Sequence, residues 1–298
     1  MKMVLFEFLQ FSPILGAGFA QTRFNFLVNR VNSVNRVNFC LSNESRLNRI
    51  SIMKFTLIRG LAREGFHWNI FPEKILEAFP GSEIELLDLQ GNGKYSSINS
   101  PINPEKYLEF LRMQSRFVKN NQKTTIIAVS FAAMISQEWV KQYPDEIKAL
   151  VFINTSLRPT SIFYRMRPSG LVKLMSAARM RNDYKRERKI LELTTCLLGD
   201  RISPLEKEWG ARAKEYRTSR KNTLKQLWTA ARMTRMDHTP SVPCLILSSK
   251  GDALVHPKSS EELAQAWNVS HSVHPKAGHD LSLDDPMWVI QQIQNFLN

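Results

Sequence analysis

Three side chains, far apart in the sequence, are of the types that together perform nucleophilic catalysis. These are Ser130, Asp252 and His279. A serine hydroxyl becomes a strong nucleophile when a histidine accepts its proton, and a carboxylate can orient that histidine and stabilise its charged form. The hypothesis depends on whether the surrounding elements can bring the three residues together.

Ser130 stands between an apolar run at 124–129 and the helical apolar pattern of 134–140. A strand, a serine and a helix without intervening loop residues require a sharp turn that projects the serine side chain. Such turns usually have glycine two residues before and after the serine, whereas this chain has Ala128 and Ala132. The added methyl groups make the turn tighter. A serine that only caps the following helix is the alternative interpretation.

The C-terminal part places the acid and the histidine after strands. The apolar run 244–247 leads into a loop that contains Asp252, followed by a helical pattern at 260–267. A short strand pattern at 270–273 then leads to the Gly-His pair that ends at His279. This order favours a catalytic set over an isolated helix cap at Ser130.

Short apolar runs alternate with helical patterns after Met53, which predicts an α/β fold with a mostly parallel, twisted sheet and helices on both faces. The spacing also predicts helices over 104–118 and 286–297. The predicted strands are 55–58, 84–87, 124–129, 149–153, 244–247 and 270–273.

The alternation stops between residues 157 and 236, where helical patterns occur without a convincing strand. We therefore predict a core formed by residues 53–156 and 237–298, interrupted by a helical insert over 157–236. Residues 1–52 lack a sustained period and contain near-duplicated Asn, Arg and Val segments. They are predicted to be a poorly ordered or non-native N-terminal extension.

Composition and charge narrow the class of protein. Hydrophobic residues make up 43% and charged residues 23%, which is typical of a globular protein and argues against a disordered or membrane-embedded one. The net charge is +14, and the insert alone has 20 Lys and Arg against 7 Asp and Glu. The basic character therefore belongs mainly to the insert.

The cysteines and the N-terminal residues indicate the cellular compartment in which the protein is expected. The 3 cysteines are widely spaced without a C-x-x-C pair, so neither a disulfide framework nor a zinc site is indicated. Residues 1–20 resemble a secretory signal, but Glu7 and Pro13 interrupt its apolar part. No stretch is long and apolar enough to predict a transmembrane segment. A cytoplasmic location is expected.

The ordered part of the chain resembles the α/β-hydrolase superfamily, in the branch of serine hydrolases with a helical cap. The Ser, Asp, His order is that of the family. The turn at 88–93, DLQGNG, is similar to the family's D-x-P-G-x-G, and Arg59-Gly60-Leu61 is similar to its H-G-x oxyanion loop, with arginine in place of histidine. The resemblance implies an α/β-hydrolase fold whose insert, 157–236, covers the active site as a cap.

The resemblance also implies a mechanism. Ser130 would be acylated, His279 would act as general base and acid, and Asp252 would orient His279. The backbone N–H groups of Phe131 and Leu61 would form the oxyanion hole. An ester or thioester is the expected substrate, although peptidase, lactonase, C–C hydrolase and acyltransferase activities share this triad. No cofactor or metal is implied.

The basic insert suggests what approaches the site. Arginines and lysines alternate with Phe163, Tyr164, Met166, Met175 and Met180. One interpretation is a solvated face over an apolar one that packs on the sheet; another is a cap with an apolar acyl pocket that attracts an acidic carrier protein or an anionic surface. Nucleic acid is not expected, because no binding module accompanies the charge.

A rival hypothesis is a catalytically inert hydrolase-fold protein that binds an acidic ligand or partner. The departures at Ala128, Ala132 and Arg59 favour this rival, and the complete triad argues against it.

Overall fold

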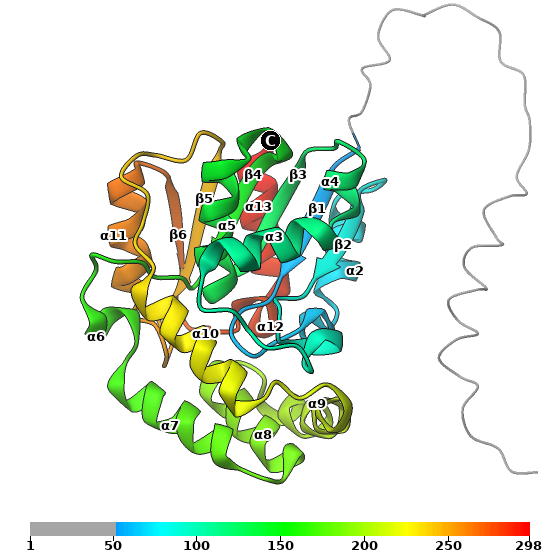
Figure 1. Cartoon of the computed structure of the whole chain (residues 1–298), viewed down its shortest axis with the longest axis vertical. Helices are drawn as coiled ribbons and strands as arrows, with labels where there is room; N and C mark the ends of the chain where they lie inside the picture. Colours follow the sequence, from blue (N-terminus) through cyan, green and yellow to red (C-terminus); the bar gives the residue numbers. More distant parts are fainter. Residues whose placement is uncertain (1–51) are drawn as a thin grey trace, which may run out of the picture. The chain divides into compact units, whose positions relative to one another are not determined.

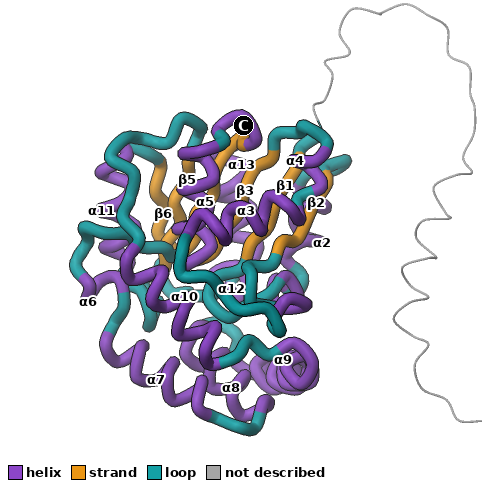
Figure 2. The backbone as a smooth tube through the Cα atoms, in the orientation of Figure 1, coloured by secondary structure: helices purple, strands orange, loops and turns teal. Residues whose placement is uncertain are grey.

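The computed structural model describes residues 52–298. The prediction of an N-terminal extension falls on residues 1–52, so nearly all of it lies outside this part. Six strands form one sheet in which every neighbouring pair is parallel, in the order β2-β1-β3-β4-β5-β6 (Figures 1 and 2). The strands are β1 (Lys54–Ile58), β2 (Glu83–Leu87), β3 (Thr124–Val129), β4 (Ile147–Ile153), β5 (Cys244–Ser249) and β6 (Ser270–His274). The predicted α/β fold with a parallel sheet is confirmed.

Both faces of the sheet are covered by helices, because alternate strand residues point to opposite sides. On one face Ile126 and Phe152 pack with residues of α3, α5 and α11, and on the other Ile127 and Val151 pack with residues of α2 and α13. Figure 1 shows α3 and α5 in front of the strands and α13 behind them. The covering helices are α2 (Phe71–Ala78), α3 (Pro104–Gln114), α5 (Phe131–Gln142), α11 (Pro257–Trp267) and α13 (Pro286–Leu297). Two short helices are α4 (Arg116–Lys119) and α12 (Leu281–Asp284).

One predicted helix is divided. The expected helix over 104–118 is α3 followed by α4, because Ser115 adopts an extended backbone between them. The Ser115 hydroxyl accepts a hydrogen bond from the Val118 N–H at 3.2 Å and so caps the second helix. Helical spacing of apolar residues continues across this break, which is why the sequence did not reveal it.

The segment between β4 and β5 is helical. Its helices are α6 (Ile162–Arg165), α7 (Pro168–Arg179), α8 (Asp183–Thr194), α9 (Ile202–Tyr216) and α10 (Arg220–Arg232). α8 and α9 enclose a small apolar cluster around Leu191 and Trp209, to which Leu283 of α12 contributes. Figure 1 shows α7, α8, α9 and α10 beyond the edge of the sheet at which the parallel strands end. In open α/β sheets, ligands bind at this edge.

A single carboxylate joins the insert to the loop after β6. Asp284 accepts backbone N–H groups of Cys196 (2.8 Å) and Leu197 (2.9 Å), which follow α8, and of Gly278 (2.7 Å), which precedes His279. The side chain of the adjacent Asp285 instead caps α13 through the Trp288 N–H. Asp284 thus shapes the loop before His279, and Asp285 caps the last helix.

We predict that Asp284→Ala lowers the free energy of unfolding by about 2–4 kcal/mol, because the buried N–H group of Gly278 and the part-buried N–H groups of Cys196 and Leu197 lose their acceptor. Asp284→Asn keeps one acceptor oxygen and is expected to cost about half as much. The matched control is Asp285→Ala, which removes only a helix cap and is expected to cost about 1 kcal/mol. Urea unfolding of the three variants measures these differences, and equal losses for both alanine variants would contradict the prediction.

Candidate active site

Ser130 lies at the turn between β3 and α5, as the sequence predicted. Its backbone has φ 55° and ψ −115°, a region that residues other than glycine rarely adopt. Two hydrogen bonds hold this conformation: the Ser130 N–H donates to the Ile153 carbonyl at 2.8 Å, and the Ser130 carbonyl accepts from the Thr155 hydroxyl at 3.0 Å. The end of β4 therefore supports the strained turn from both sides.

The glycine that this turn requires is Gly60, which follows the neighbouring strand β1. Ala128 and Ala132 are fully buried and are accommodated without a glycine. At Gly60, after β1, a Cβ atom would lie 2.8 Å from the Val129 carbonyl oxygen and 3.2 Å from the Ser130 Cβ. The segment after β1 can approach the turn this closely only because residue 60 lacks a side chain.

His279 and Asp252 form a buried pair. The His279 Nδ1 lies 2.7 Å from the Asp252 Oδ2, and the other oxygen of Asp252 accepts N–H groups of Leu254 (2.7 Å) and Val255 (2.9 Å). Burial lowers the pKa of His279, but the carboxylates of Asp252 and Asp280 outweigh this effect and leave the pKa raised. The pair can therefore orient the imidazole and stabilise its charged form.

Asn154, a residue that sequence reasoning missed, holds the backbone of the loop after β6 that contains His279. It directly follows β4, and its side-chain amide donates to the carbonyls of His279 (2.8 Å) and Gly278 (3.2 Å) and to the Ser249 hydroxyl (3.1 Å). A polar residue at the carboxyl end of a central parallel strand was the available signal.

Arg59 forms a buried ion pair with Asp280. Its guanidinium donates to both carboxylate oxygens, at 2.9 Å to Oδ1, and to the Ser282 hydroxyl at 3.1 Å. The Trp68 ring lies 5.0 Å from the guanidinium carbon. Burial raises the pKa of Asp280, but Arg59 outweighs this effect and the pKa is lowered. Asp280 is therefore the ionised partner of Arg59.

The two expected oxyanion donors lie beside the same cavity as Ser130. Leu61 and Phe131 both line it. Neither backbone N–H donates to a protein acceptor within residues 52–298. The Cβ position of Gly60 is 3.6 Å from the Phe131 nitrogen, so the two segments that carry these N–H groups are adjacent. Both N–H groups are free to bind a ligand oxygen.

A cavity of about 700 Å³ opens between the sheet edge and the insert. Ser130 and His279 line it together, whereas Asp252 is buried behind His279. Of the insert residues expected in an apolar pocket, Phe163, Met166 and Met175 line the cavity; Tyr164 and Met180 do not. Further apolar side chains from the insert are Leu171, Leu174, Ile190, Leu224, Leu227 and Trp228.

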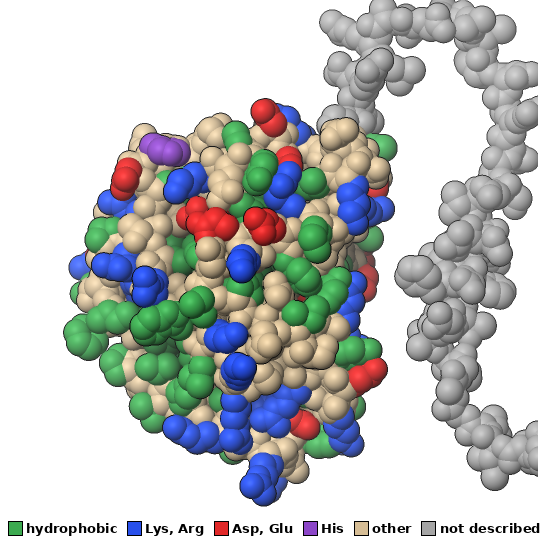
Figure 3. Space-filling view, viewed as in Figure 1, with side chains coloured by type: hydrophobic (Ala, Val, Ile, Leu, Met, Phe, Trp, Pro, Cys, Tyr) green, Lys and Arg blue, Asp and Glu red, His purple; other side chains and the backbone are tan. Residues whose placement is uncertain are grey.

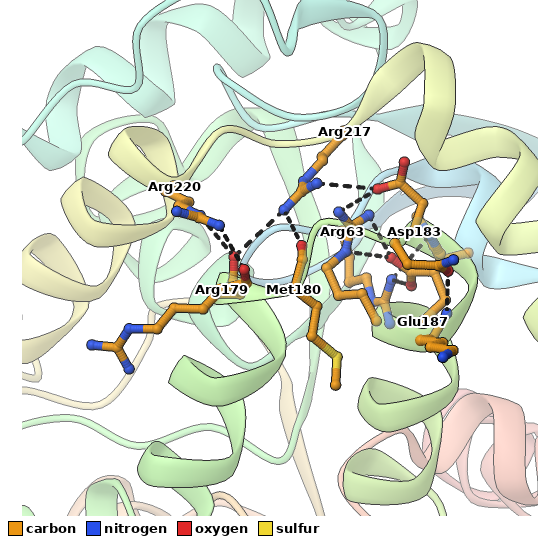
Figure 4. A network of polar contacts seen from close by, with 12 residues as sticks. Arg63, Arg179, Met180, Asp183, Glu187, Arg217 and Arg220 are labelled. Carbon is orange, nitrogen blue, oxygen red and sulfur yellow. Dashed lines mark hydrogen bonds and ion pairs between the residues drawn. The ribbon is translucent and has the colours of Figure 1, made fainter.

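A polar network ties the insert to the segment after β1 (Figure 4). Arg63 pairs with Glu187 of α8 at 2.5 Å, and its guanidinium carbon lies 4.9 Å from the Trp209 ring centre. Beneath this contact His67 is buried edge-on against Trp209, so it packs under the loop and does not line the cavity. The insert thereby contacts the segment that contains Leu61.

None of the helices within residues 52–298 combines the length and apolar character needed to cross a membrane.

No curated protein matches the chain in sequence. Solved structures do match in fold. An esterase from Thermogutta terrifontis is 19% identical, with a TM-score of 0.63 over 82% of this chain and 89% of that one.

Two other similar structures support the same fold. An esterase from Rhodococcus sp. ECU1013 is 11% identical, with a TM-score of 0.65 over 83% of this chain and 90% of that one. A meta-cleavage product hydrolase from Pseudomonas fluorescens IP01 is 14% identical, with a TM-score of 0.66 over 83% and 90%. The family model described as the alpha/beta hydrolase fold matches residues 57–286. The chain therefore belongs to the α/β-hydrolase family.

Proposed function

We propose that this protein is a serine hydrolase that cleaves a carboxylic ester or thioester through an acyl-enzyme on Ser130. The observation that carries the proposal is the placement of Ser130 and His279 on one apolar cavity, with His279 bound to Asp252 at 2.7 Å. A nucleophile, a base and an orienting carboxylate are thus available where an acyl chain has room to bind.

The proposed reaction has two halves. In the first, the Ser130 Oγ attacks the acyl carbon while the His279 Nε2 takes its proton, and the proton then passes to the leaving alcohol or thiol. In the second, water attacks the acyl-enzyme, and His279 again takes and returns the proton. The negative oxygen of each tetrahedral intermediate would bind to the N–H groups of Leu61 and Phe131.

The insert would serve as the cap of this site. Its apolar side chains supply an acyl or alkyl pocket, and its positive charge favours an acidic carrier protein or an anionic surface as the source of a small acyl substrate. A cytoplasmic location remains part of this proposal, on the ground of cysteine usage.

An inert binding protein is the second candidate, and one observation favours it. Within the described residues, the Ser130 hydroxyl has no hydrogen bond to His279. Catalytic hydrogen bonds are often long before substrate binds, so this geometry is also compatible with an active enzyme. The two candidates differ in whether Ser130 is activated, which labelling tests directly.

Wild-type protein is expected to react with a fluorophosphonate probe, and Ser130→Ala and His279→Ala are expected to lose this labelling because they remove the nucleophile or its base. Hydrolysis of a short-chain ester should fall by about 10³-fold or more in both. Ser156 also lines the cavity, so Ser156→Ala is the matched control and should still label. An unlabelled, folded wild-type protein would favour the binding-protein candidate.

The pH dependence should follow His279. The base must be neutral, so kcat/KM is expected to rise with pH through the raised pKa of His279 and to level off above it. Asp252→Asn removes a carboxylate that raises this pKa, so the rising limb should move to lower pH while the plateau drops by roughly 10²–10⁴-fold. His238→Gln, at an exposed histidine, should change neither. A limb that does not move in Asp252→Asn would contradict this assignment.

We predict that Arg59 and Asp280 are positioning residues that act as a unit. Arg59→Met and Asp280→Leu each leave one buried charge unpaired and are expected to cost about 3–5 kcal/mol of stability. The double variant should cost much less than the sum, and it should restore part of the activity lost in each single variant. Urea unfolding and ester kinetics of the four proteins measure the coupling, and strictly additive losses would argue against a unit.

A further inference from the structure

Large apolar side chains are exposed around the opening of the cavity. Ile162 and Phe163 of α6, Val172 of α7, and Leu224 and Trp228 of α10 are 52–69% exposed. All except Val172 also line the cavity. Figure 3 shows hydrophobic side chains gathered over these three helices, on a hollowed part of the surface, with Lys and Arg around them. Clusters of this kind mark interaction sites. We call these five residues the entrance rim.

All charged residues in the chain segments around the entrance rim are basic. Segments 158–181 and 217–235, which include α6, α7 and α10, contain twelve Lys and Arg and no Asp or Glu. Every acidic residue of the insert lies between these segments, in 182–216. The insert segments that contain the rim therefore contribute one sign of charge, although the insert as a whole contains both signs.

Three glutamates of the insert compensate arginines away from the rim. Glu187 pairs with Arg63 and Arg186, and Glu192 and Glu206 both pair with Arg188. Of the twelve basic side chains around the rim, only Arg217 forms an ion pair with a carboxylate within residues 52–298. Figure 4 shows this pair and the Arg220 guanidinium, which donates to backbone carbonyls at the end of α7. Most of the positive charge around the rim is uncompensated.

We propose that the entrance rim docks on an anionic lipid surface, from which the acyl substrate enters the cavity. The rim residues would enter the boundary between headgroups and acyl chains, and the surrounding Lys and Arg would contact the anionic headgroups. Because the cavity opens within the apolar patch, an acyl chain would pass from lipid to protein without crossing water. The docking stands on these surface features alone; the delivery of substrate rests on the proposed function.

A lipid surface fits this patch better than an acidic protein does. The exposed rim side chains belong to three separate helices and include two aromatic residues, Phe163 and Trp228, which are types found on the apolar face of membrane-surface helices. An acidic carrier protein would pair with the basic side chains but would leave the rim to be covered by apolar groups of its own. Vesicle binding and carrier-protein binding distinguish the two kinds of partner in the experiment below.

The test is co-sedimentation of the full chain with vesicles of phosphatidylcholine alone or with about 30% phosphatidylglycerol. We expect binding to the anionic vesicles only, and weakening by added salt. Lys173→Glu with Lys221→Glu should weaken binding by about tenfold or more, since each basic residue near the surface contributes about fivefold. Val172→Ser should weaken it by about threefold.

These three positions lie outside the cavity lining, so hydrolysis of a short soluble ester should be unchanged in the variants. Each test variant has a matched control away from the cavity. The control for the charge reversals is Lys119→Glu with Lys148→Glu, near the amino ends of β3 and β4. The control for Val172→Ser is Met113→Ser, at a residue of α3 that is 66% exposed. The charge reversals of the control are expected to weaken binding by less than threefold, and Met113→Ser should leave it unchanged.

The outcomes separate this inference from the proposed function. Ser130→Ala should bind vesicles like the wild type, because docking does not need the nucleophile. Vesicle binding by a protein that neither labels nor hydrolyses esters would overturn the proposed function and keep the docking. Absence of binding to anionic vesicles, equal binding to neutral ones, or binding unaffected by the rim variants would overturn the docking. Binding to an acidic acyl carrier protein without binding to vesicles would assign the surface to a protein partner.

Discussion

The backbone conformation of Ser130 is the constraint on which the rest of the site depends. A non-glycine residue with φ 55° costs free energy, so the surrounding structure must compensate for it. The support comes from three strands: β3 leads into the turn, Ile153 at the end of β4 and Thr155 just after it hold its N–H and its carbonyl, and Gly60 after β1 allows close contact. The same close contact places the N–H of Leu61 near that of Phe131. One strained residue therefore accounts for the position of the candidate nucleophile and of both candidate oxyanion donors.

A second constraint is buried charge beside the imidazole. Arg59 is 4% exposed, and an unpaired guanidinium at that depth would be strongly destabilising. Asp280 compensates it, and because Asp280 adjoins His279 the ion pair also connects the loop after β6 to the end of β1. The two charges act on the pKa of His279 in opposite directions, so their close pairing limits the net effect on the base. The buried arginine at position 59 is thus stable only together with this carboxylate.

Local patterns in the sequence predicted much of this structure, since they report on elements that bury one face. All six strands were predicted to within two residues at either end, because apolar runs in a parallel sheet are continuous. Ser130 and His279 were recognisable because a turn or a Gly-His pair fixes their local context. The contacts of Asn154 with Gly278 and His279 and the Arg59–Asp280 pair could not be predicted, because they join residues more than 120 positions apart that no local pattern relates. The role of residues 1–52 and the catalytic roles of the triad remain predictions.

The separation of charge within the insert is a consequence of its two tasks. α8 contacts the core through the ion pair of Glu187 with Arg63, and a buried contact of this kind requires that each charge be paired. Most Lys and Arg side chains around the opening are exposed or half-buried, so water solvates them and they need no carboxylate partner; the buried Arg165 instead donates to the carbonyls of Ala230 and Ala231. Acidic residues are therefore needed in 182–216, whereas nothing in the fold requires their absence from the segments on either side. That absence, together with apolar side chains left exposed at the opening, is a feature that folding alone does not explain, and binding to an anionic surface does.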